Sequence, residues 1–248
     1  MEPRQNTIGD ILESEKSMVL DAADKYGKFF VNACEINSLL NSFIKSVDPD
    51  RYFFAIFLSQ IKKHHTLALF SAVRLHHVQT GMNIRHVLEA GSWAAFAIAN
   101  TEKEKFYIED EQGYIDYPEK LKLQKNSWIE QNFSDGSQAI KRNVKNIGST
   151  TAHSNIVYAQ KNFDFNFEKG VFETPFFDHE DDFRVKTDLW QIANTGYGLM
   201  DLFYGINKKF GGIKFADDFI PKIKELKRVN DLLKLEMLQH PRMQKFKN

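Results

Sequence analysis

The sequence has almost no cysteine: Cys34 is the only one among 248 residues. A single cysteine excludes a framework of intrachain disulfides and is typical of a protein from a reducing compartment. A chain of this length buries roughly 70–75% of the surface that its unfolded form exposes, so its core requires neither disulfides nor a structural metal. We therefore expect a globular protein that is stabilised by apolar packing.

Long apolar runs and an excess of one charge are also lacking. The longest uninterrupted apolar run, Trp93–Ala99, is far shorter than the ~20 residues that a membrane-spanning helix requires. The first residues lack the apolar segment of a signal peptide. The 33 basic and 33 acidic residues cancel, so there is no overall attraction to nucleic acid. These absences favour a cytoplasmic protein without a membrane partner.

Apolar residues instead recur at helical spacing through most of the chain, beginning in the N-terminal segment. Thr7 and Asp10 have the spacing of a capping box and predict that a helix begins there. The helical pattern then continues over residues 8–44. Gly27 lies midway and predicts a bend or break, because glycine is unfavourable inside a helix.

A helical hairpin is predicted in the next segment. Asp48 is expected to cap a helix that begins at Pro49, where the missing N–H is tolerated, and that runs to about Gln79. Gly81 is expected to end this helix. The next helix, over residues 83–100, would then return antiparallel to it because the connection is so short.

The second half of the chain predicts four more helices, which brings the total to about seven. Gly211 and Gly212 mark the end of the longest of them, which is apolar on two faces and is therefore expected at the centre of the bundle. With no flexible linker in view, we expect one domain over residues 1–248 with a frayed tail over 239–248. The four helices are expected over residues 118–133, 139–147, 181–210 and 218–239.

One segment, residues 163–176, has the alternation of a β-hairpin instead. Lys169 and Gly170 supply a two-residue turn. A hairpin alone is only marginally stable in water, so its aromatic face is expected to dock on the helices. The expected cross-strand pairs are Phe167 with Phe172, Phe165 with Thr174, and Phe163 with Phe176. The predicted fold class is thus an all-α bundle with one small antiparallel hairpin near 163–176.

The polar residues that could form a site gather around the helical hairpin. With a turn at Gly81, Arg85 and Glu89 would lie near His76 and Arg74, and His153 would complete a polar pocket. The alternative is that Arg85 and Glu89 form an i, i+4 ion pair that ties two helices together. Both interpretations remain open from the sequence.

Strong cofactor and metal motifs are lacking. There is no glycine-rich dinucleotide fingerprint, phosphate-binding P-loop, zincin motif or paired-cysteine site. His86 and Glu89 have the spacing of one half of a di-iron site, but the second such pair is missing. We therefore expect neither a metal nor a cofactor.

Two segments together resemble a broad set of uncharacterised bacterial helical proteins. Residues 82–90 resemble their Arg-x-x-x-Glu helix, and residues 149–154 resemble the Ser/Thr-then-His segment that follows it. The resemblance spans residues 50–210. Such proteins are in turn similar to HEPN-type bundles, many of which act in toxin–antitoxin or phage-defence systems.

Active HEPN ribonucleases carry an arginine that is followed four to six residues later by a histidine. This chain departs from that pattern, because Arg74 is followed too closely by His76 and His77. For this chain to cleave RNA, a substitute set of catalytic residues such as Arg85, Glu89 and His153 would have to replace that motif.

Two functions of different classes follow. The first is a helical module that binds a small anionic ligand or a protein partner through the polar pocket, where an arginine would hold an anionic group. The second is a metal-independent ribonuclease of toxin or defence type, with RNA as its partner and a histidine as acid or base. A homo-oligomer is compatible with both.

Overall fold

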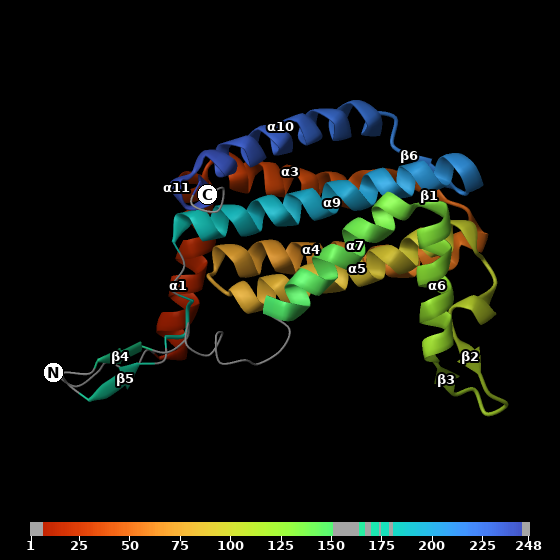
Figure 1. Ribbon diagram of the computed structural model, residues 1–248, viewed down its shortest axis with the longest axis horizontal. Helices are drawn as coiled ribbons and strands as arrows, with labels where there is room; N and C mark the ends of the chain where they lie inside the picture. The colour runs from red at the N-terminus through yellow and green to blue at the C-terminus, as the bar shows by residue number, and fades with distance from the viewer. Residues whose placement is uncertain (1–6, 151–163, 167–169, 174, 179–180, 245–248) are drawn as a thin grey trace.

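The computed structural model describes residues 7–150, 164–166, 170–173, 175–178 and 181–244 (Figure 1). Within these ranges the chain forms ten α-helices. The all-α fold class is thus confirmed, and the helices are more numerous than the seven or so that were predicted. The helices are α1 (Ile8–Leu20), α2 (Ala22–Tyr26), α3 (Lys28–Ser42), α4 (Tyr52–Val73), α5 (His77–Ala99), α6 (Glu119–Asn132), α7 (Ser134–Thr150), α9 (Asp182–Phe210), α10 (Phe219–Gln239) and α11 (Pro241–Gln244).

The strands in the described residues are short and form three antiparallel pairs. Two pairs were not expected. One lies in the connection between α5 and α6. The other joins the segment after α3 to the segment after α9, next to the Phe43, Phe215 and Phe219 rings. The pairs are β1 (Ile44–Val47) with β6 (Ile213–Phe215), β2 (Ile108–Glu109) with β3 (Ile115–Asp116), and β4 (Asp164–Asn166) with β5 (Val171–Glu173).

The first helical segment begins as predicted but is divided into three helices. The Thr7 hydroxyl accepts a hydrogen bond from the Asp10 N–H, and the Asp10 carboxylate accepts one from the Thr7 N–H, which confirms the capping box. The chain first breaks at Asp21 and then at Gly27, whose φ of 53° favours glycine. These two breaks account for most of the additional helices.

The turn between α4 and α5 lies earlier than predicted. It is formed by residues 74–76, whereas Gly81 is buried inside α5. Leu75 occupies the left-handed region with a φ of 59°, which is uncommon for a residue other than glycine. The His76 N–H donates to the Ser71 carbonyl, and the Asp178 N–H donates to the Leu75 carbonyl. The prediction placed the turn at a glycine, but these hydrogen bonds fix it at a leucine.

Helix α9 is central, as its two apolar faces predicted. It packs against α3, α4, α5 and α10, while α7 crosses the α4–α5 hairpin obliquely (Figure 1). A Cβ atom on Gly196 would lie 2.6 Å from Nε2 of His65, so glycine is needed where α9 meets α4. Gly198, two residues further along α9, has no neighbour within 4 Å of its Cβ position.

The β4–β5 hairpin exists, but its register and position differ from the prediction. Phe165 pairs with Phe172 rather than with Thr174, because Asn166 and Val171 already face each other across the turn. Figure 1 shows β4 and β5 extending away from the helices, so the two strands themselves do not lie against the bundle as expected. The predicted Phe163 and Phe167 pairs involve residues outside the described ranges.

Two predicted helix ends also differ. Asp48 precedes a 3-10 turn over Pro49–Arg51, not an α-helix, and its side chain makes no capping hydrogen bond. Helix α7 extends to Thr150, beyond the predicted end at residue 147. Among the described residues, no helix combines the length and apolar character needed to cross a membrane.

Candidate functional site

The shift of the α4–α5 turn separates the predicted site residues into two groups. Arg74 and His76 lie at the turn itself, whereas Arg85 and Glu89 lie further along α5. At 1.5 Å per residue, Arg85 is about 12 Å along the helix from its first residue. The predicted proximity of Arg85 to His76 is therefore wrong. His153 lies outside the described residues.

At the turn, Arg74 and His76 bind a partner that the sequence did not indicate. Nη1 of Arg74 is 3.3 Å from one carboxylate oxygen of Glu15 on α1, and Nε2 of His76 is 2.9 Å from the other. The hydrogen bond with His76 is the main reason why the pKa of the Glu15 carboxyl is lowered. Phe176 and Phe177 pack against the His76 ring. This group attaches α1 to the hairpin.

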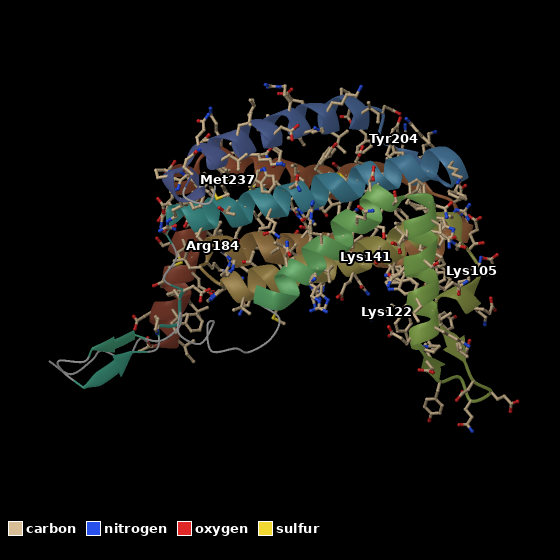
Figure 2. The ribbon with its side chains drawn as sticks, viewed as in Figure 1. Lys105, Lys122, Lys141, Arg184, Tyr204 and Met237 are labelled. Atoms are coloured by element: carbon tan, nitrogen blue, oxygen red, sulfur yellow. The ribbon has the colours of Figure 1, made fainter. Side chains whose placement is uncertain are left out.

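Arg85 and Glu89 instead line a pocket that helices α5, α6 and α7 enclose. Its volume is about 410 Å³, which lies in the range of small-molecule sites. Figure 2 labels two of its lysines, Lys122 on α6 and Lys141 on α7. The apolar part of the lining consists of Ile129, Ile140 and Val144, and the polar part of Arg85, Glu89, Ser92, Trp93, Tyr117, Lys122, Lys125, Asn126, Ser137 and Lys141.

Positive charge dominates the lining of this pocket. Arg85, Lys122, Lys125 and Lys141 are opposed by one lining carboxylate, Glu89. Nε of Arg85 is 2.8 Å from Oε1 of Glu89, and the two side chains are 36% and 48% exposed. Lys122 and Lys141 pair with acids outside the lining, at 3.3 and 2.6 Å. Exposed pairs of this kind contribute about 0.2–1 kcal/mol each, so an incoming anion can replace them.

Lys125 differs from the other three cations because it is buried. Nζ donates to the Ser92 hydroxyl at 2.6 Å and lies 4.9 Å from the centre of the Trp93 ring. Burial lowers the pKa of Lys125 to about 8, the Glu89 charge opposes this, and Lys122 adds to it. A lysine with a lowered pKa inside a cavity is typical of functional sites.

Two aromatic rings form one side of the pocket. The Trp93 and Tyr117 rings lie edge to face, 5.4 Å apart. Burial, followed by the nearby Glu119 carboxylate, raises the pKa of Tyr117 to about 12. Its phenol therefore stays protonated near neutral pH and can donate a hydrogen bond to an anion. The rings and the cations together suit a ligand with an anionic group and a flat apolar part.

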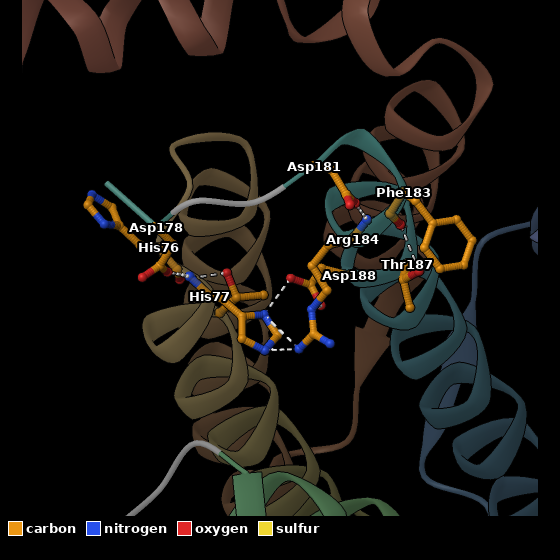
Figure 3. Close-up of polar contacts among 9 residues, drawn as sticks. His76, His77, Asp178, Asp181, Phe183, Arg184, Thr187 and Asp188 are labelled. Carbon is orange, nitrogen blue, oxygen red and sulfur yellow. Dashed lines mark hydrogen bonds and ion pairs between the residues drawn. The ribbon is translucent and has the colours of Figure 1, made fainter. Parts of the chain in front are cut away.

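A third polar group connects α5 with α9 and is buried (Figure 3). Nδ1 of His77 lies 2.7 Å from Oδ2 of Asp188, and the two side chains are 8% and 7% exposed. Arg184 donates from Nη2 to Nε2 of the same ring. The carboxylate of Asp178 also accepts from the His77 N–H, at 2.6 Å. Its burial makes this group a structural link.

Sequence reasoning missed this network and half of the pocket. Ser92 and Lys125 are 33 residues apart, and His77 and Asp188 are 111 residues apart, so no local spacing connects them. The signal that did exist was a lysine, Lys125, on the apolar stripe of α6 with Leu121 and Ile129. A charged residue in a buried stripe requires a partner or a cavity.

Comparisons with known proteins do not assign this chain to a family. Searches against protein-family models, curated proteins and solved structures found no match to this chain. Within the described part of the chain, no group of three or more His, Cys, Asp or Glu side chains is arranged to hold a metal ion. The pocket between α5, α6 and α7 is therefore the candidate functional site.

Proposed function

We propose that the protein binds a small organic anion in the pocket between α5, α6 and α7. The observation that carries this proposal is the excess of cationic side chains around two aromatic rings. Glu89 is the one carboxylate among the lining residues that the structure describes. The planar guanidinium of Arg85 suits a carboxylate or phosphate group. The Trp93 ring offers an apolar face for the rest of the ligand.

The Arg85–Glu89 pair fits this function better than it fits a tie between helices. Both partners belong to α5, four residues apart, so the bond does not connect two elements. Such a pair contributes only about 0.2–0.5 kcal/mol to a helix. Its position on the pocket wall places a guanidinium where an anion would enter.

Calorimetric titration with matched compounds tests the proposal. We expect phenyl phosphate and benzoate to bind, and benzyl alcohol, which lacks the charge, to bind at least about tenfold more weakly, a difference of about 1.4 kcal/mol. Arg85→Met should weaken the binding of both anions. Arg228→Met is the matched control, because Arg228 forms a similar helical pair with Glu225 on α10, away from the pocket. Equal binding of charged and uncharged compounds would refute the proposal.

The ribonuclease alternative is tested by a cleavage assay with the same two variants. A nucleotide also presents a phosphate and a flat ring, which suit cations and aromatic side chains. No histidine is among the lining residues that the structure describes, so Glu89, Tyr117 or a lysine would have to act as the acid or base. If the protein cleaves mixed RNA, and if Arg85→Met abolishes this cleavage while Arg228→Met retains it, the ribonuclease function would be favoured over ligand binding.

A further inference from the structure

The amine of Lys125 has an unusual environment within the pocket. The residue is 6% exposed, and its Nζ donates to the Ser92 hydroxyl at 2.6 Å. In the described residues, no carboxylate oxygen lies within ion-pair distance of this Nζ. The Ser92 hydroxyl in turn donates to the Glu89 carbonyl at 2.7 Å. The amine is therefore held in a fixed position beside the cavity without a counter-ion.

The charges that face Lys125 come from all three helices of the pocket. Arg85 and Glu89 lie on α5, Lys122 on its own helix α6, and Lys141 on α7. Three of these four groups are cationic and disfavour a further positive charge. With a pKa of about 8, roughly a tenth of the Lys125 side chains are neutral at pH 7, about 300-fold more than for an ordinary lysine. A neutral amine is a nucleophile, whereas an ammonium is not.

We propose that Lys125 is a nucleophile that forms an imine with a small anionic aldehyde or ketone held in the pocket. This inference rests on the proposed function, because the cations would hold the anionic group while the carbonyl carbon meets Nζ. The Ser92 hydroxyl acts as a positioning group for the amine. The flat part of the compound would lie against Trp93, whose ring centre is 4.9 Å from Nζ.

The reaction balances without an oxidant or reductant. The lone pair of neutral Nζ attacks the carbonyl carbon, and the carbonyl π electrons move to oxygen. One proton passes from nitrogen to that oxygen, which gives a carbinolamine. The hydroxyl then leaves with the second amine proton as water, and the carbon–nitrogen double bond forms. Amine and carbonyl thus become imine and water, and Lys125 returns to its free form on hydrolysis.

Pyridoxal 5′-phosphate is a suitable probe because it carries a phosphate, a flat ring and an aldehyde. The full-length protein would be incubated with it, reduced with borohydride and mapped by peptide mass spectrometry. We expect labelling of Lys125 to be at least about tenfold faster than that of any other lysine, because of its larger neutral fraction. The rate should reach half its maximum near pH 8, the pKa of Lys125.

Two variants and a second compound separate the possible results. Lys125→Arg keeps the charge and should lose the label, whereas Lys227→Arg, on α10 and outside the pocket, should keep it on Lys125. Pyridoxine 5′-phosphate lacks the aldehyde and reports binding alone. If it binds but Lys125 is labelled no faster than surface lysines, the imine proposal is wrong and the binding function stands. If it does not bind and no lysine is preferred, both proposals fail.

Discussion

Acidification should destabilise this protein through His65, which lies at the contact between α4 and α9. The ring is 1% exposed, with Nε2 at 3.1 Å from the Ile192 carbonyl oxygen and Nδ1 at 2.8 Å from Oδ1 of Asn37. Burial lowers the pKa of His65 from 6.5 to about 4, although the bond to the Ile192 carbonyl opposes this. A carbonyl only accepts, so the neutral ring carries its proton on Nε2 and accepts at Nδ1. The Asn37 amide must then turn its NH₂ group toward the ring.

The direction and size of the effect follow from these two pKa values. The unfolded chain protonates His65 near pH 6.5, whereas the folded protein does so near pH 4. The unfolded state therefore binds more protons in this window, and the free energy of unfolding falls as the pH is lowered through it. The difference corresponds to about 3 kcal/mol in total, of which about 2 kcal/mol is lost by pH 5.

Urea unfolding at several pH values measures this loss. The wild type should lose about 2 kcal/mol more than His65→Gln between pH 7.5 and pH 5. His86→Gln, which removes an exposed histidine of α5, should retain the wild-type dependence. An NMR titration of the His65 ring measures its pKa directly in the wild type, so this test does not require His65→Gln to fold. A pKa at or above 6.5 would refute the reasoning, since it would mean that the two acceptors hold the ring as a cation.

Two further predictions concern the helix contact and the pocket. Gly196→Ala should lower the free energy of unfolding by about 1–3 kcal/mol, because the new methyl group would meet the His65 ring, whereas Gly198→Ala has open space and should not destabilise the fold; equal urea midpoints for the two variants would contradict this. Glu89→Gln should change stability by no more than about 0.5 kcal/mol while tightening the binding of phenyl phosphate, because it frees the Arg85 guanidinium. Weaker binding in the calorimeter would show that Glu89 contacts the ligand directly.

Local signals in the sequence predicted much of the fold. The capping box at Thr7, the break at Gly27 and the end of α9 at Gly211 each depend on residues within one or two helical turns. The turn at Leu75 was not predicted, because the Leu75 carbonyl accepts a hydrogen bond from the N–H of Asp178, which is distant in the sequence. A backbone conformation imposed by tertiary contacts leaves no mark in local composition.

The candidate site was predicted only in part, because local spacing in the sequence places residues of one helix but not residues of different helices. Arg85 and Glu89 share a helix, so their spacing alone brings them together. Placing His76 beside them required the correct turn, and an error of a few residues moved it to a different part of the molecule. Lys125 and Tyr117 reach the pocket from α6 and from the connection before it. Their convergence with α5 depends on how helices pack, which periodicity does not specify.

The buried amine of Lys125 should cost the fold stability, and this cost is itself evidence for a function. Its pKa of about 8 in the folded protein lies below the ordinary value of 10.5. The folded state thus binds protons less tightly, and at pH 7, below both values, the full cost of about 3 kcal/mol applies. It decreases only as the pH rises from 8 toward 10.5. Lys125→Met keeps the apolar stem and leaves the Ser92 hydroxyl bonded to the Glu89 carbonyl.

The variant Lys125→Met should therefore unfold at a higher urea concentration than the wild type at pH 7, by about 1–3 kcal/mol, with a smaller advantage at pH 10. Lys122→Met is the control, because Lys122 is half-exposed and its loss should change stability by about 0.5 kcal/mol or less. A gain in stability together with lost labelling by pyridoxal 5′-phosphate would indicate an amine that the fold keeps at a cost for its chemistry. A loss of stability would instead make Lys125 a structural residue that secures α6 to α5 through Ser92.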